Sequence, residues 1–155
     1  MDTHDGEGVT VLAADICWGL LRSTDVGRLA VSVAGEPDIF PVNYVVDQGT
    51  IVFRTAPGTK LSSVVVGNAV AFEVDGYEPE AGEAWSVVVK GSGEQITRSQ
   101  ELIDTTDLPL FPWQAGAKHR FVRIVPTEVS GRRFGVVDRS AWETPLDGAP
   151  RTGRD

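Results

Sequence analysis

The hydrophobic positions of this chain change period along its length. Near the start, Ile16, Cys17, Leu20 and Leu21 fall on one stripe at helical spacing, which predicts an amphipathic helix over residues 13–23. Beyond this segment, apolar and polar residues alternate, which is typical of strands that bury one face. The pattern therefore predicts a helix followed by a sheet.

The alternation predicts three consecutive strands that short turns join into an antiparallel meander. Turn signals occur at residues 35–37 (Gly-Glu-Pro) and 47–49 (Asp-Gln-Gly). The second is interpreted as a three-residue hairpin loop in which Gly49 adopts a positive φ. The three predicted strands cover residues 28–33, 39–46 and 50–54.

The second half of the chain continues the pattern, with short helices between strands. A helix that Thr59 caps is predicted to end at Gly67. Residues 75–82 are expected to form an acidic loop, and Pro126 within the last strand indicates a strand end, an edge or a bulge. The remaining predicted elements are strands at 70–74, 85–96 and 121–129, a helix at 98–107 and an irregular loop at 109–116.

These elements predict a mainly β fold. Several strands joined by hairpins, with short helices between them, favour a small closed or nearly closed β-barrel, and an open α+β sheet is the alternative. A chain of 155 residues corresponds to one domain. We expect a flexible N-terminal tail over residues 1–10, the barrel over 11–137 and a polar C-terminal tail over 138–155.

Charge and composition exclude several classes of function. Lys and Arg number 14 against 22 Asp and Glu, and the net charge of −8 argues against nucleic acid or an anionic membrane as partner. One cysteine and two histidines cannot form a closed zinc site, so no metal is expected. No apolar run approaches the ~18 residues that a membrane span requires. The start of the chain lacks the apolar stretch of a signal peptide, so a cytoplasmic location is expected.

One segment carries a signal for anion binding. The predicted strand that ends with Arg54 and Thr55 is followed by a Pro-Gly turn and a helix that starts with Thr59 and Lys60. Free N–H groups at a helix start attract anions, whereas a lysine there faces the positive end of the helix dipole. A bound anion would resolve that conflict, and the alternative is a solvated lysine beside a capping threonine.

A second segment interrupts a strand with polar residues. Pro41 removes a donor from the ladder, and Asn43 is a poor strand residue whose amide both donates and accepts hydrogen bonds. Such a position suits the edge of a flat heterocycle with alternating donors and acceptors. A strand bulge that satisfies Asn43 is the alternative.

Two runs of sequence resemble a known family. The first contains Pro-Asp-Ile-Phe-Pro-Val-Asn-Tyr-Val-Val and then Ile-Val-Phe-Arg-Thr-Ala-Pro-Gly-Thr-Lys-Leu, ending at Leu61. The second is Trp-Ser-Val-Val-Val-Lys-Gly at residues 85–91. In their order and spacing these runs are similar to those of the pyridoxamine 5′-phosphate oxidase-like flavoproteins, and the resemblance covers residues 13–134.

The resemblance implies a split β-barrel that forms a homodimer and binds FMN at the dimer interface. Carried over by position, the phosphate site would consist of Arg54, Thr55, Thr59 and Lys60. The residues beside the isoalloxazine ring would be Pro41, Val42, Asn43, Trp85, Ser86 and Trp113.

The implied activity is that of an FMN-dependent oxidoreductase acting on a small-molecule substrate or electron acceptor. No side chain stands out as an acid–base catalyst, which is compatible with hydride transfer at a flavin. Two alternatives remain: an F420-dependent reductase on the same fold, and a non-catalytic protein that binds or sequesters flavin. The net charge of −8 favours FMN, since the oligoglutamate tail of F420 would require more positive charge.

Overall fold

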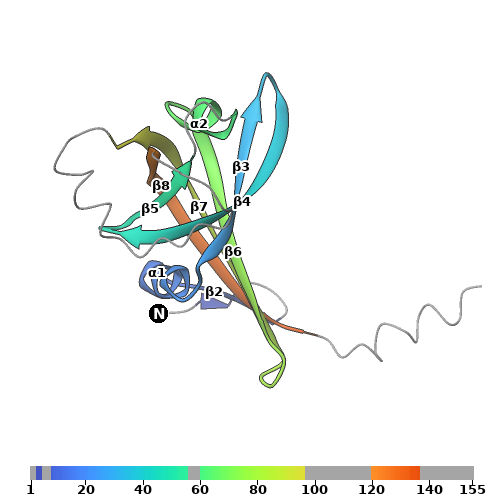
Figure 1. Cartoon of the computed structure of the whole chain (residues 1–155). Helices are drawn as coiled ribbons and strands as arrows, with labels where there is room; N and C mark the ends of the chain where they lie inside the picture. Colours follow the sequence, from blue (N-terminus) through green and yellow to red (C-terminus); the bar gives the residue numbers. More distant parts are fainter. Residues whose placement is uncertain (1–2, 5–7, 56–59, 97–119, 137–155) are drawn as a thin grey trace, which may run out of the picture.

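A computed structural model describes residues 3–4, 8–55, 60–96 and 120–136 of the chain (Figure 1). Two short helices accompany eight strands in this part of the molecule. The helices are α1 (Ala14–Arg22) and α2 (Lys60–Val65). The strands are β1 (Thr3–His4), β2 (Val9–Val11), β3 (Val26–Val33), β4 (Glu36–Asp47), β5 (Thr50–Thr55), β6 (Ala69–Glu78), β7 (Glu83–Gln95) and β8 (Arg120–Gly135).

The strands close into a barrel. The sheet order is β1-β2-β8-β5-β4-β3-β6-β7, and β7 also pairs with β8, so that β8, β5, β4, β3, β6 and β7 form a ring. Each of these pairings is antiparallel. The predicted mainly β fold with short helices is confirmed as a split β-barrel, and the alternative of an open α+β sheet is wrong.

The predicted meander of β3, β4 and β5 is present, but its turns are tighter than expected. Asp47 pairs with Thr50, so the connection contains only Gln48 and Gly49, not three residues. Both have positive φ, 48° and 70°, as a type I′ turn requires, and this turn matches the right-handed twist of the strands. The β3–β4 turn is shifted in the same way, because β4 already begins at Glu36.

Strand β4 changes partner along its length, and this change splits the barrel wall. Residues up to Asn43 pair with β3, whereas pairing with β5 begins at Tyr44, which lies opposite Phe53. At the change, the Tyr44 N–H donates to the carbonyl oxygen of Asp25 at 3.0 Å. Consequently β4 and β5 separate beyond the Tyr44–Phe53 pair, while β5 continues to Thr55.

The expected acidic loop over residues 75–82 is wrong. Strand β6 extends to Glu78, which pairs with Glu83, so most of the segment belongs to a β6–β7 ribbon (Figure 1). Residues 77–80 are exposed, and the ribbon projects away from the barrel. A ribbon without a buried face needs no apolar alternation, which explains why its acidic sequence resembled a loop.

The long strand β8 closes the ring and bends at a bulge. Gly91 pairs with Pro126 but Lys90 pairs with Glu128, so Thr127 is the extra residue. The prediction that Pro126 marks an irregularity is confirmed, as a bulge. Gly91 is required there, because a Cβ at this position would lie 2.1 Å from the carbonyl oxygen of Val125.

The first ten residues are not simply a tail. Strand β1 pairs with β2, and β2 pairs with β8 through Val9–Val11, so this part of the expected N-terminal tail belongs to the sheet. The predicted helix at 98–107, the loop at 109–116 and the C-terminal tail at 138–155 lie outside the described residues.

The predicted helix at the start of the chain is confirmed as α1, which packs against one end of the barrel (Figure 1). Its Cys17 and Leu21 side chains are completely buried in the main core cluster. The Tyr44 hydroxyl donates to the Leu21 carbonyl oxygen at 2.5 Å and also contacts the Thr24 hydroxyl. Helix α1 therefore fixes β4 at the point where that strand changes partner.

Inside the barrel, apolar side chains from every strand of the ring meet. The edge of the Tyr44 ring packs on Phe72, with ring centroids 4.7 Å apart. Helix α2 follows β5 and ends before Gly67, as predicted. The largest completely buried side chains of the described residues include Phe53, Phe72, Leu21, Leu29, Ile51 and Ile124.

Candidate functional site

The split between β4 and β5 brings together most of the predicted site residues that the structure describes. Asn43 and Arg54 are the next residues beyond the last pair, Tyr44 and Phe53, on the two separating strands. Because side chains alternate along strands and Tyr44 and Phe53 lie in the core, Asn43 and Arg54 share the outer face. Thr55 follows Arg54 and points inward.

Asn43 has one satisfied and one unsatisfied end. Its Nδ2 group donates to the carbonyl oxygen of Asp25 at 3.5 Å. Its Oδ1 atom is buried and accepts no hydrogen bond from the described part of the chain. A buried polar atom without a partner costs about 1–3 kcal/mol, so this oxygen is a candidate contact for a ligand.

Thr55 is the second unsatisfied group. It is 2% exposed, the one buried polar side chain among the described residues, and its Oγ1 atom has no hydrogen-bond partner there. Thr55 ends β5, and Lys60 begins α2 shortly after it. A hydroxyl both donates and accepts, so Thr55 can bind a phosphate oxygen at this strand end.

Arg54 supplies positive charge on the outer face of the same strand end. Its guanidinium carbon lies 5.7 Å from the centre of the Phe121 ring, a cation–π contact with the neighbouring strand β8. Phe121 belongs to a small outer cluster with Val52 and Ile96, and Val45 packs against it. This contact restricts the Arg54 side chain to the region of the split.

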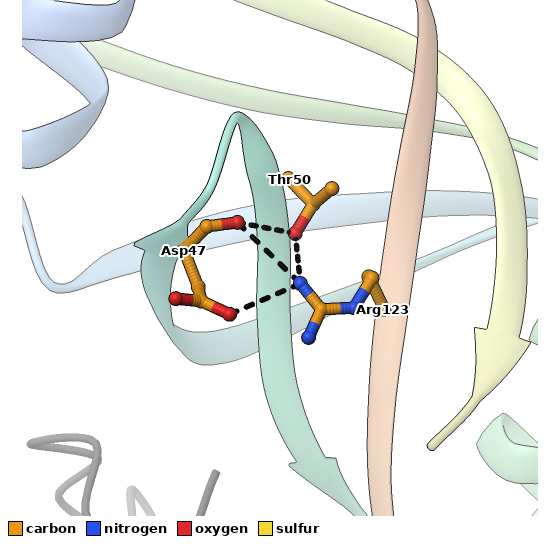
Figure 2. A network of polar contacts seen from close by, with 3 residues as sticks. All are labelled: Asp47, Thr50 and Arg123. Carbon is orange, nitrogen blue, oxygen red and sulfur yellow. Dashed lines mark hydrogen bonds and ion pairs between the residues drawn. The ribbon is translucent and has the colours of Figure 1, made fainter. Parts of the chain in front are cut away.

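A second arginine on this face belongs to a structural network that the sequence did not reveal (Figure 2). One Nη atom of Arg123 donates to Asp47 Oδ2 at 3.1 Å and to Thr50 Oγ1 at 2.5 Å. The Thr50 hydroxyl in turn donates to the Asp47 carbonyl oxygen at 2.6 Å. Arg123 and Asp47 neutralise each other, and their ion pair links β8 to the β4–β5 hairpin.

The other predicted ring contacts lie elsewhere. Trp85 is 6% exposed, points into the core of its own barrel and covers Gly76, and Ser86 is half-buried on the opposite face of β7. In the sheet order, β3 and β6 separate β7 from β4. The structure therefore does not bring Trp85 and Ser86 beside Asn43 within one subunit, and their predicted role stays a prediction.

Pro41 and Val42, two further predicted ring contacts, lie on opposite faces of β4. Pro41 is exposed on the outer face of β4 with Asn43, whereas Val42 is 6% exposed and packs in the core. Thr59 and Trp113 lie outside the described residues. Asp25, whose carbonyl oxygen accepts hydrogen bonds from both Tyr44 and Asn43, was missed, because a backbone acceptor leaves no signature in side-chain chemistry.

Ionisable groups outside the split form a separate cluster on β3 and β6. Arg28 forms ion pairs with Glu73 and Asp75 at 3.1 and 3.0 Å. Burial, together with the neighbouring Asp75 carboxylate, raises the pKa of Glu73, and Arg28 opposes this effect. Burial also raises the pKa of Tyr44 in the core. Arg28 lies opposite Pro41, so the charged cluster borders the outer face of β4, whereas Tyr44 lies in the core where β4 and β5 separate.

The described residues lack two further features. They contain no group of three or more His, Cys, Asp or Glu side chains placed to hold a metal ion. None of their helices is long and apolar enough to cross a membrane.

Comparison with known proteins identifies the family. Residues 13–133 match the family model described as pyridoxamine 5′-phosphate oxidase. The chain belongs to this family. The resemblance of the two sequence runs is thereby confirmed, and the matched region contains the whole of the β4–β5 split.

Proteins from several bacteria are similar to this family member. The FAD binding protein of Mycobacterium smegmatis is 38% identical, with a TM-score of 0.72 over 81% of this chain and 98% of that one. An FAD-binding protein of Mesorhizobium loti is 29% identical, with a TM-score of 0.64 over 81% and 97% of the two chains. The Mycobacterium tuberculosis protein Rv0080 is 35% identical over 131 residues, which cover 81% of this chain and 86% of that protein.

Proposed function

We propose that this protein binds a flavin at the split between β4 and β5. The proposal rests on two buried polar atoms there, Asn43 Oδ1 and Thr55 Oγ1, for which the described residues offer no hydrogen-bond partner. Asn43 lies on the outer face of β4 and Thr55 points inward at the end of β5, and a fold with two such atoms gains stability when a polar ligand satisfies them. The similarity to two proteins named for FAD binding supports a flavin as that ligand.

The polar groups of the split suit both the ring edge and the phosphate group of FMN. The ring edge carries an N–H group between two carbonyl groups, which complements an amide such as that of Asn43. The phosphate requires donors and positive charge, and the hydroxyl of Thr55, the guanidinium of Arg54 and Lys60 at the start of α2 supply them. Thr59 precedes Lys60 in the sequence and completes the proposed phosphate site.

FMN is the cofactor that we propose first, because the split accounts for one ring and one phosphate. FAD is the second candidate, since two similar proteins carry FAD binding in their names and FAD contains the same riboflavin phosphate. The deazaflavin F420 remains an alternative with the same ring edge. A bound flavin supplies hydride or electron transfer, while the residues of the chain bind and orient it.

The activity that we propose is that of a flavin-dependent oxidoreductase with a small-molecule substrate or electron acceptor. The rival is a flavin carrier without turnover. Reduction of the loaded protein, followed by rapid mixing with candidate acceptors, separates the two. An oxidoreductase transfers its electrons to a specific acceptor faster than free reduced flavin does, whereas a carrier shows no such advantage.

We propose further that two copies of the chain form a homodimer that covers the ring. On the outer face of β4, Ile39 is 63% exposed and Pro41 is exposed as well, close to Asn43 on the same strand. Apolar side chains beside a flat ligand are an expected contact for a second subunit. Light scattering at micromolar concentration tests this, because a mass of 16.6 kDa, that of one chain, contradicts the dimer.

Binding measurements test the flavin site directly. Purified protein, stripped of any cofactor, is titrated with FMN, FAD, riboflavin and F420 while flavin fluorescence is followed. Lys60→Ala is expected to weaken FMN binding about 10- to 150-fold, as loss of a charge-assisted contact of about 1.5–3 kcal/mol predicts. Riboflavin, which lacks the phosphate, binds both forms equally. The proposal fails if none of the four compounds binds at micromolar concentration.

A further inference from the structure

The orientation of the Asn43 amide is fixed by its surroundings. The carbonyl oxygen of Asp25 accepts two hydrogen bonds, from the Tyr44 N–H at 3.0 Å and from Asn43 Nδ2 at 3.5 Å. A rotated amide would place Oδ1 against this carbonyl oxygen, where two acceptors repel each other. The NH₂ end therefore faces Asp25, and Oδ1 is left as a pure acceptor.

This acceptor has no donor in the described part of the chain, although it is buried. An oxygen cannot be satisfied by a carbonyl group, so the group that completes the site must carry an N–H or O–H. Of the polar groups on the pyrimidine edge of an oxidised flavin, only the imide N3–H is a donor, and it lies between two carbonyl oxygens.

We infer that Asn43 is a specificity-determining residue whose Oδ1 accepts a hydrogen bond from the imide N3–H of the bound flavin. This inference rests on the proposed flavin site and adds the polarity of one contact to it. The contact selects rings with a free imide N–H and rejects rings in which that nitrogen is alkylated. It applies equally to FMN, FAD and riboflavin, since all three share the ring edge.

The local structure makes this acceptor rigid enough to discriminate. Asn43 lies where β4 leaves β5, and the adjacent Tyr44 is held at its N–H by Asp25 and at its hydroxyl by the Leu21 carbonyl oxygen. The Tyr44 ring is 3% exposed, so the backbone at Asn43 is anchored on the core side. The backbone that carries the acceptor is therefore held in place when a ligand that cannot donate approaches it.

The test compares riboflavin with 3-methylriboflavin, in which a methyl group replaces the imide hydrogen. Affinities are measured by fluorescence titration for the wild type, for Asn43→Leu and for a control, Asn68→Leu. The control removes an exposed asparagine whose Nδ2 also donates to a backbone carbonyl, that of Val64 at 3.0 Å. Leucine has the same branched arrangement of four side-chain heavy atoms as asparagine and is no smaller, so any steric exclusion of the methyl group persists in Asn43→Leu while the acceptor is lost.

We expect the wild type and Asn68→Leu to prefer riboflavin over 3-methylriboflavin about 5- to 150-fold, the range expected for one unmet buried acceptor. In Asn43→Leu the ratio falls to about one, because riboflavin binds more weakly while 3-methylriboflavin does not. The inference is overturned if the preference persists in Asn43→Leu, which would make it steric, or if the wild type binds both compounds equally.

Two features of the design keep its outcomes distinct. The wild-type comparison requires no variant, and equal binding of the two compounds there already overturns the inference. If Asn43→Leu does not fold, Asn43→Ala serves as the second substitution that separates a hydrogen bond from a steric clash. If riboflavin and FMN both bind but the methylated ring is not rejected, the specificity inference is wrong and the flavin site stands. If no flavin binds to the wild type, the proposed function itself is wrong.

Discussion

The substitution Thr55→Val is expected to raise the stability of the cofactor-free protein and to lower its affinity for FMN. Valine has nearly the shape of threonine but replaces the hydroxyl by a methyl group. The Thr55 side chain is 2% exposed and its hydroxyl oxygen has no partner among the described residues. Removing such a group relieves about 1–3 kcal/mol of uncompensated desolvation. The cofactor-free variant should therefore be more stable than the wild type, against the usual direction for a buried substitution.

The expected effect on binding has the opposite sign. If the hydroxyl contacts the flavin phosphate, its loss removes a hydrogen bond to a charged group, which is worth about 1.5–3 kcal/mol. FMN affinity should fall by about 10- to 150-fold, whereas riboflavin affinity should change little. In thermal unfolding, the cofactor-free variant should melt about 2–12 °C above the wild type for a domain of this size.

Thr50→Val is the matched control. The Thr50 hydroxyl is satisfied, since it donates to the Asp47 carbonyl oxygen and accepts from Arg123. The same chemical change there should destabilise the protein by about 1–3 kcal/mol, because it leaves the partners unpaired. Chemical denaturation of both cofactor-free variants measures the contrast. Destabilisation by Thr55→Val as large as that by Thr50→Val would contradict the assignment of an unsatisfied hydroxyl to Thr55.

Two further substitutions test the barrel. Gly91→Ala should destabilise the fold by several kcal/mol, about the upper range for single substitutions, because its Cβ would lie 2.1 Å from the Val125 carbonyl oxygen of the paired strand; an unchanged urea midpoint contradicts this. Burial raises the pKa of Glu73 above its ordinary value in the folded state. The folded state therefore retains a proton that the unfolded state loses, and stability declines as the pH rises through this titration. Glu73→Gln should remove that decline, so its melting temperature relative to the wild type rises between pH 4 and pH 7 (about the span of that titration), and a constant difference counts against the assignment.

Much of the fold could be predicted because local patterns and burial agree. Helix α1 was predicted from its apolar stripe, and its Cys17 and Leu21 are indeed completely buried. The β6–β7 ribbon was missed because strands without a buried face carry no alternation, and acidic residues 75–80 then resemble a loop. The tight turn at Gln48 was misjudged because the left-handed conformation of a non-glycine residue is set by strand twist, not by its side chain.

The candidate site was predicted in part for a similar reason. Asn43 and Thr55 stand out in the sequence as polar residues within or at the end of apolar strands, and each has a buried atom without a hydrogen-bond partner in the described part of the chain. Trp85 was placed near the ring by the resemblance alone, and a position carried over from a family does not tell which face of β7 the side chain takes or which subunit it serves. The link between Arg123 and Asp47 spans 76 residues, and no local pattern encodes such a contact.

Strand β8 also constrains how the molecule is made. It is the last of the described strands along the chain, yet it pairs with β2, β5 and β7, which come from three separate regions. During synthesis, β5 and β7 therefore keep open hydrogen-bonding edges until residues 120–135 leave the ribosome. Closure then depends on contacts between distant parts of the chain, a topology that folds slowly. The nascent chain passes through a stage in which its apolar strands are vulnerable to aggregation, and the charged ribbon residues and the net charge of −8 favour solubility during that interval.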